Sequence, residues 1–123
     1  MFRTEMAHCN TNRHPNILRL LGSFTEPGVK MCIVLELCPH GSLLKYIRTT
    51  RVTDADVANI ACGVARGMDH LHARCRVLQR DLKASNILLD LNLTPKVRPV
   101  PWIWWVLRLF ASPACLSFPL ADR

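Results

Sequence analysis

The chain has 123 residues, which is room for one modest domain and excludes two full ones. Half of its residues are apolar and 20% are charged, a composition that favours a folded core over disorder throughout. The formal net charge is +7, but the basic residues form no long run and no aromatic residues alternate with them, so nucleic-acid binding is not expected.

A β-hairpin is predicted first. Residues 17–24 (ILRLLGSF) and 31–37 (MCIVLEL) are apolar runs of strand length. Between them stand Glu26, Pro27 and Gly28, a turn sequence. The two runs are therefore expected to pair antiparallel.

Two helices are predicted next. In residues 42–50, three apolar side chains fall on one helical face and Ser42 can cap the N-terminus. In residues 53–72, apolar residues recur with the helical period, and Thr53 followed by Asp56 resembles a capping box. The second segment predicts the main amphipathic helix of the chain.

The interior of that helix contains two glycines, Gly63 and Gly67. A glycine inside a helix costs about 1 kcal/mol relative to alanine. Their presence suggests that a neighbouring element packs closely against the helix.

Residues 77–97 read as a two-residue strand, a polar loop, a short strand over 87–89, a turn, and a short strand over 95–97. Beyond this point the chain is rich in Trp, Leu and Pro without a clear period. We therefore divide it into a folded part, 1–97, and an unrelated tail, 98–123, that is disordered or poorly packed. Arg108 and two prolines argue against a membrane span in the tail.

The six cysteines show no C-x-x-C pair and no metal-site spacing, so reduced thiols are expected. The polar N-terminal residues 1–16 lack the apolar segment of a signal peptide. Both features favour a cytosolic location.

The loop over residues 79–86 (QRDLKASN) resembles the H-R-D-L-x-x-x-N catalytic loop of protein kinases. Three other segments resemble the same family in the correct order: residues 14–22 (HPNILRLLG) the entry to the fourth strand, 33–43 (IVLELCPHGSL) the fifth strand and hinge, and 66–72 (RGMDHLH) the end of the helix before the catalytic loop. Four ordered segments make a chance resemblance negligible.

The resemblance implies an α+β architecture, namely a partial bilobal protein kinase fold with the end of the small-lobe sheet, the hinge, the first large-lobe helices and the catalytic loop. It implies ATP-dependent phosphoryl transfer to Ser/Thr or Tyr hydroxyls of proteins, with ATP and Mg²⁺ as cofactors. A protein substrate or a partner kinase would be the partner, in the cytoplasm or at the cytosolic face of a longer membrane receptor.

Residue by residue, Asp81 matches the catalytic aspartate that orients the substrate hydroxyl, and Asn86 matches a metal ligand. Lys83 matches the lysine that many Ser/Thr kinases place near the transferred phosphate. The hinge and the stretch Gly41–Leu43 look closer to tyrosine kinases and the tyrosine-kinase-like group, so the acceptor hydroxyl stays open.

The resemblance also implies an adenine site. Leu35 falls at the gatekeeper position, Glu36 and Cys38 fall where hinge backbone groups bind adenine, and Leu88 would lie beneath the ring. Glu5 stands where the family places the glutamate of its αC helix, although the polar residues that follow it do not favour a packed helix there.

The chain departs from the family where no Gly-rich loop or strand-three lysine precedes Glu5, no Asp-Phe-Gly follows Val97, and Gln79 replaces the usual histidine. The lysine–glutamate ion pair and the metal-binding aspartate of that triplet are both needed for phosphoryl transfer. Neither binding of ATP and Mg²⁺ nor activity is therefore expected of this chain alone. Two alternatives remain open: a noncatalytic binding module, and a gene-model product without a stable fold.

Overall fold

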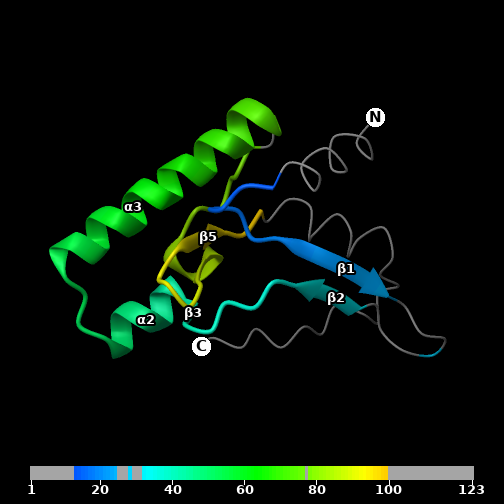
Figure 1. Cartoon of the computed structure of the whole chain (residues 1–123). Coiled ribbons are helices and arrows are strands. Elements are labelled where there is room, and N and C mark those ends of the chain that lie inside the picture. The colour runs from blue at the N-terminus through cyan, green and yellow to red at the C-terminus, as the bar shows by residue number, and fades with distance from the viewer. Residues whose placement is uncertain (1–12, 25–27, 29–31, 77, 100–123) are drawn as a thin grey trace.

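The computed structural model describes residues 13–24, 28, 32–76 and 78–99. These form two small antiparallel sheets and several helices, so the α+β prediction is confirmed (Figure 1). In chain order the elements are β1 (Leu20–Phe24), β2 (Cys32–Leu35), β3 (Gly41–Ser42), α2 (Leu43–Thr49), α3 (Asp54–Asp69), the π-helix η1 (His70–Arg74), the 3-10 helix η2 (Ala84–Asn86), β4 (Ile87–Leu89) and β5 (Pro95–Val97).

β1 and β2 pair antiparallel, with Leu20 opposite Leu35 and Phe24 opposite Cys32. This confirms the predicted hairpin. β1 begins three residues later than predicted because the preceding residues join the other sheet instead: Ile17 forms a parallel bridge with Val97 of β5.

The second sheet has the order β3-β4-β5, and its strands are antiparallel. β4 and β5 confirm the predicted short strands. β3 was not predicted, since two residues are too short to show a pattern, and Gly41 enters it with a positive φ of 68° that favours glycine. The strand predicted over 77–78 is wrong at Leu78, whose backbone is in no strand and whose side chain is 61% exposed.

Local capping signals set both helix starts as predicted. The Ser42 hydroxyl accepts a hydrogen bond from the Lys45 backbone N–H (3.2 Å). Thr53 and Asp56 form a reciprocal capping box at the start of α3. The helical path then continues through η1 to Arg74, two residues beyond the predicted end.

The two glycines of α3 face the segment before β1 and the strand β5. A Cβ atom on Gly63 would clash with Cγ of Pro95, and one on Gly67 would lie 2.6 Å from the backbone oxygen of Asn16. The predicted close packing is confirmed, and only glycine fits these positions without displacing a neighbour.

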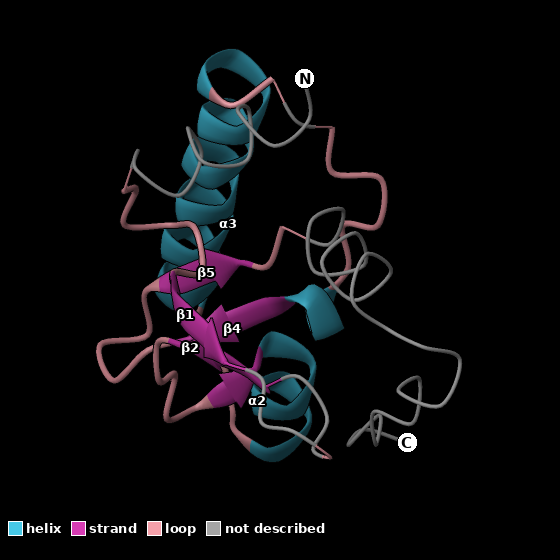
Figure 2. Ribbon diagram, turned by 90° about the vertical axis from the view of Figure 1, so that its right-hand side faces the viewer, coloured by secondary structure: helices cyan, strands magenta, loops and turns pink. Residues whose placement is uncertain are grey.

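The core lies where α3, η1 and β5 meet, and it contains the buried residues Leu71, Cys75 and Val97. Val97 N–H donates to the Asn16 carbonyl (2.8 Å), and Leu18 N–H donates to the Val97 carbonyl (3.0 Å). Figure 2 shows α3 running alongside the strands that carry this core. The loop that follows η1 is thus anchored to the sheet at both of its ends.

Cys75 is disulfide-bonded, whereas Cys38 and Cys62 are free thiols. The expectation of reduced thiols is therefore wrong for Cys75. Spacing along a sequence does not show which sulfur atoms the fold brings within bonding distance.

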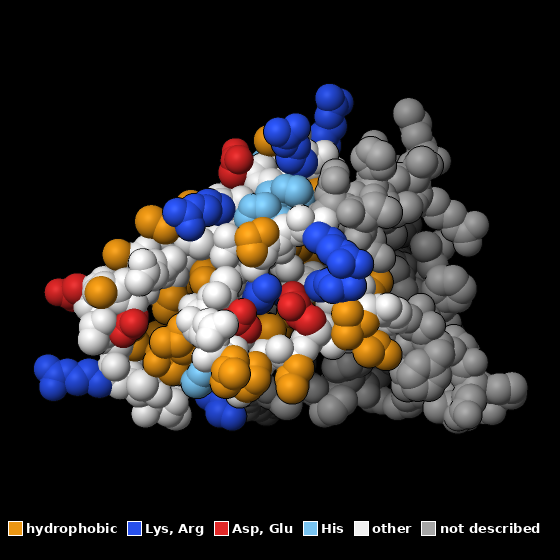
Figure 3. Space-filling view, in the orientation of Figure 1, with side chains coloured by type: hydrophobic (Ala, Val, Ile, Leu, Met, Phe, Trp, Pro, Cys, Tyr) orange, Lys and Arg blue, Asp and Glu red, His pale blue; other side chains and the backbone are white. Residues whose placement is uncertain are grey.

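Basic side chains are spread over the face shown in Figure 3 and do not gather into one patch. Within the described ranges, none of the helices has the length and apolar character needed to cross a membrane.

His14 gives the fold a pH dependence. Its Nδ1 accepts a hydrogen bond from the Asn16 backbone N–H (3.0 Å), and its ring stacks on His70 with centroids 4.6 Å apart. Burial lowers the pKa of His14 below its usual 6.5, and the charges of His70, Lys96 and Arg66 lower this pKa further, against a small opposing effect of Asp69. Protonation would also remove the acceptor at Nδ1.

The unfolded chain therefore binds this proton more readily than the folded chain. The contribution of His14 to stability is present above the unfolded pKa of 6.5 and is lost as the pH falls toward the lowered folded pKa. We expect the midpoint of thermal unfolding to fall more between about pH 7.5 and about pH 5.5 in the wild type than in His14→Asn. His72→Asn, at an exposed position, is the control, and parallel curves for the wild type and His14→Asn would contradict the assignment.

Candidate active site

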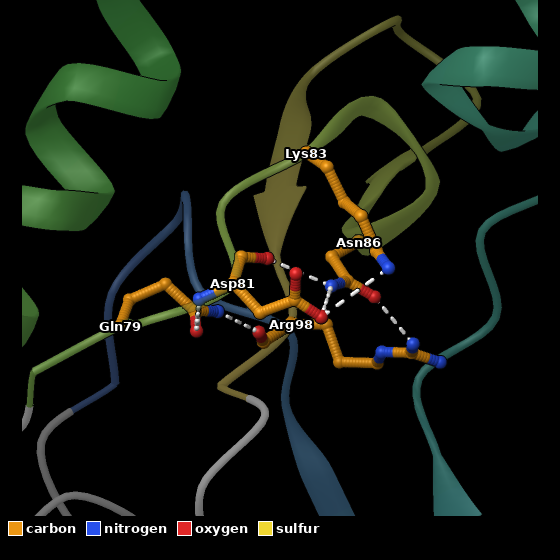
Figure 4. Close-up of polar contacts among 5 residues, drawn as sticks. All are labelled: Gln79, Asp81, Lys83, Asn86 and Arg98. Carbon is orange, nitrogen blue, oxygen red and sulfur yellow. Dashed lines mark hydrogen bonds and ion pairs between the residues drawn. The ribbon is translucent and has the colours of Figure 1, made fainter.

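Asp81, Lys83 and Asn86 come together on the loop between η1 and β4 (Figure 4). The loop ends in η2, where the Asn86 backbone N–H donates to the Lys83 carbonyl (2.9 Å) and turns the chain back toward the sheet. This turn places the side chains of Asp81 and Asn86 against each other although four residues separate them.

Asn86 is the buried centre of this cluster, with an exposed fraction of 1%. Its Nδ2 donates to the Asp81 backbone carbonyl (2.8 Å) and to the Asp81 carboxylate Oδ2 (3.1 Å). The amide therefore fixes both the backbone and the carboxylate of Asp81.

Lys83 lies on the solvent side of the cluster. Its Nζ is 3.3 Å from Oδ2 of Asp81, and the side chains are 56% and 52% exposed. An ion pair this exposed adds little stability. The ion pair does, however, place a cationic group beside the Asp81 carboxylate on the solvent-exposed side of the loop.

The loop is also held by Gln79 and Arg98. Sequence analysis did not assign these two residues to the site. Gln79 Nε2 donates to the Arg98 carbonyl (2.6 Å), and its Oε1 accepts from the Asp81 backbone N–H (3.3 Å). The Arg98 backbone N–H donates to the Asn86 carbonyl (2.9 Å), and its guanidinium donates to Oδ1 of Asn86.

The position of Arg98 could have been inferred from strand register. The predicted short strands 87–89 and 95–97 pair with Ile87 opposite Val97, which puts Arg98 next to Asn86 at the following position. Spacing within the loop motif alone carries no information on this cross-strand neighbour.

The hinge candidates Leu35 and Glu36 lie at and just after the end of β2. Glu36 exchanges hydrogen bonds with Arg19: its N–H donates to the Arg19 carbonyl (3.0 Å), and its Oε1 accepts from the Arg19 N–H (2.8 Å). Its Oε2 pairs with Nζ of Lys96 (3.5 Å), and these two side chains are only 25% and 12% exposed. Glu36 thus ties the hinge to both sheets.

Leu88 stands opposite Lys96 in the β4–β5 ladder, so the two side chains share a sheet face. Since Lys96 pairs with Glu36, this is the face turned toward the hinge. Burial and the charge of Glu36 raise the pKa of the Cys38 thiol, against a small opposing effect of Lys96, and the Cys38 carbonyl accepts from the Gly41 N–H (3.0 Å). Glu5 lies outside the described residues.

The cluster does not fit a divalent metal ion. Oδ1 of Asn86 is the atom that would ligate Mg²⁺, and the guanidinium of Arg98 donates to it. Oδ2 of Asp81 is already contacted by the Asn86 amide and the Lys83 ammonium. In the part of the chain that the structure describes, no three His, Cys, Asp or Glu residues are grouped to hold a metal.

The family model described as "Protein kinase domain" matches residues 1–98. The chain belongs to the protein kinase domain family. The match confirms the family seen in the motifs, and the kinase loop described above, with Asp81, Lys83 and Asn86, lies within the matched residues.

Curated plant kinases resemble this kinase domain at about 40% identity. Leaf rust 10 disease-resistance locus receptor-like protein kinase-like 2.4 from Arabidopsis thaliana is 42% identical over 101 residues, which is 78% of this chain and 16% of that protein. Rust resistance kinase Lr10 from Triticum aestivum is 39% identical, and receptor-like serine/threonine-protein kinase SD1-7 from Arabidopsis thaliana is 42% identical. The same 78% of this chain covers 16% and 12% of these two relatives.

The chain is therefore a protein kinase domain fragment, homologous to receptor-like and Ser/Thr kinases and spanning less than a sixth of the length of these relatives. The names of these relatives do not indicate the tyrosine kinase or tyrosine-kinase-like group expected from the hinge.

Proposed function

We propose that this chain supplies the hinge and catalytic loop of a Ser/Thr protein kinase domain, and that it does not transfer a phosphoryl group in the form described here. Asp81 would orient the substrate hydroxyl and accept its proton. The observation that carries the proposal is the Asp81 carboxylate held by the buried Asn86 amide, with the Lys83 ammonium 3.3 Å away on the solvent side.

The Ser/Thr assignment rests on Lys83. Its ammonium stands where it would offset the negative charge of a phosphoryl group beside Asp81. The name of one relative, a receptor-like serine/threonine-protein kinase, supports the same acceptor class. Membership of the tyrosine-kinase-like group stays a prediction from residues 33–43.

Adenine would bind between the hinge and β4. The Glu36 N–H is used by Arg19, which leaves the Glu36 carbonyl and the Cys38 N–H as the hinge groups for adenine. Leu35 and Leu88 would supply the apolar walls. ATP as ligand, a protein as substrate, and a cytosolic location in a longer receptor are part of this proposal, supported by the family and by the receptor-like names of the relatives.

Two features motivate the proposal that phosphoryl transfer is absent. The Arg98 guanidinium contacts the amide oxygen that would bind the metal, and residues 98–123 contain no Asp-Phe-Gly to supply the second metal ligand. The tail was predicted to begin at residue 98, but Arg98 contacts Asn86 and Gln79 and lies inside the family match, so we treat only residues 99–123 as a part separate from the kinase fold.

A chimera tests the catalytic role of the loop. Residues 14–97 would replace the matching segment of an active full-length relative, so that the host supplies the Asp-Phe-Gly and every other part. We expect incorporation of labelled phosphate into a protein substrate, reduced about 10²- to 10⁴-fold by Asp81→Asn. The unmodified chain should give no incorporation above its own Asp81→Asn variant. A folded chimera that binds nucleotide but transfers nothing would overturn the proposal, as would Asp81-dependent transfer by the unmodified chain.

A further inference from the structure

Both polar atoms of the Asn86 side chain, Nδ2 and Oδ1, already make hydrogen bonds within the loop. A carboxylate only accepts hydrogen bonds, so Nδ2 must face Asp81; a guanidinium only donates, so Oδ1 must face Arg98. The amide orientation is therefore fixed by its two partners. A metal ion could reach Oδ1 only by displacing Arg98.

The charge of the cluster also disfavours a metal. It contains one carboxylate, Asp81, and two cationic side chains, Lys83 and Arg98. A site for Mg²⁺ gathers anionic and neutral oxygen atoms, whereas this cluster has a surplus of positive charge. The ligand class that such a site attracts is an anion.

The cationic groups keep hydrogen-bond donors to spare. The ammonium of Lys83 has three donors and the guanidinium of Arg98 has five, and each makes one contact within the cluster. Figure 4 shows both groups on the same side of Asn86. An ammonium and a guanidinium side by side are the groups that proteins use to bind phosphate oxygens.

We propose that this loop is a metal-independent anion site for a phosphate group, in which the Arg98 guanidinium occupies the place of the divalent cation on Asn86. Arg98 would bind the phosphate and position Asn86, and Lys83 would leave Asp81 partly to make a second contact. The inference rests on the contacts of the loop and not on the proposed catalytic role, so failure of the chimera would leave it standing.

The test is calorimetric titration of the whole chain with inorganic pyrophosphate in EDTA, and again with Mg²⁺ in place of EDTA. We expect binding in EDTA that Mg²⁺ does not strengthen. Arg98→Met should weaken it about tenfold or more, because a charge-assisted contact is lost. Arg48→Met, at an exposed position in α2, is the matched control and should bind like the wild type.

The direction in which Asp81→Asn changes the affinity for pyrophosphate distinguishes an anion site from a metal-mediated site. Removing the carboxylate frees Lys83 and removes a repulsive charge, so an anion site should bind pyrophosphate several-fold more tightly, whereas a metal-mediated site should lose affinity. Asp81 is exposed, and an asparagine can still accept from Asn86, so this variant stays informative even if Arg98→Met does not fold. Absence of binding by the wild type, binding that requires Mg²⁺, or weaker binding by Asp81→Asn would each overturn the inference.

Discussion

Gly67→Ala is expected to lower the free energy of unfolding by about 1–3 kcal/mol, the range for overpacking a close contact. The new Cβ would lie 2.6 Å from the backbone oxygen of Asn16 and 3.2 Å from Cγ2 of Val97. That oxygen accepts the Val97 N–H at 2.8 Å, so moving it away strains the junction that anchors β5. The clash outweighs the gain of about 1 kcal/mol that alanine usually brings to a helix.

The matched control is Ala65→Gly, at an exposed position of the same helix. It should cost about 1 kcal/mol through helix propensity alone. Urea unfolding followed by far-ultraviolet circular dichroism measures both variants. If Gly67→Ala proves more stable than the wild type, α3 does not pack against the Asn16 carbonyl as described.

The helix and strand predictions succeeded where the signal is local. Thr53 and Asp56 are three residues apart and form the capping box that their identities indicate, and Ser42 caps α2 in the same way. β3 escaped prediction because its partner, β4, is more than 40 residues away and its two residues show no period of their own. Long-range pairing decides such an element, and sequence patterning does not record it.

In the candidate site too, local spacing was predictable from the sequence and long-range contacts were not. Loop spacing was sufficient to bring Asp81, Lys83 and Asn86 together, since they lie within six residues. Their catalytic and metal-binding roles remain predictions. The loop motif identified residue types but not partners, so it did not reveal that Arg98, the residue after β5, contacts Asn86.

In the hinge, the sequence likewise did not reveal the long-range contacts of the Glu36 side chain. The resemblance placed Glu36 at the adenine site through its backbone, whereas its side chain joins Arg19 of the segment before β1 to Lys96 of β5. The three residues are far apart in the sequence. Their contact depends on how the two sheets meet, which short apolar runs do not specify.

Asn86→Ala is expected to lower the free energy of unfolding by about 2–4 kcal/mol, because a buried amide with charged partners on both sides is lost. The Asp81 carbonyl and carboxylate lose their donor, and the Arg98 guanidinium loses its acceptor. Asn92→Ala is the control: Asn92 is exposed in the turn between β4 and β5, and the change should stay within about 0.5 kcal/mol.

A double-mutant cycle with Arg98→Met separates the two halves of the Asn86 contact. If the guanidinium acts through Asn86, Arg98→Met should cost less in the Asn86→Ala background than in the wild type, with a coupling of about 1 kcal/mol or more. The free energies come from urea unfolding of the four proteins. Arg98→Met keeps the backbone bonds of residue 98 to Asn86 and Gln79, so additive losses would mean that the Arg98 side chain stabilises the loop independently of the Asn86 amide, and that its guanidinium does not take the place of the metal ion.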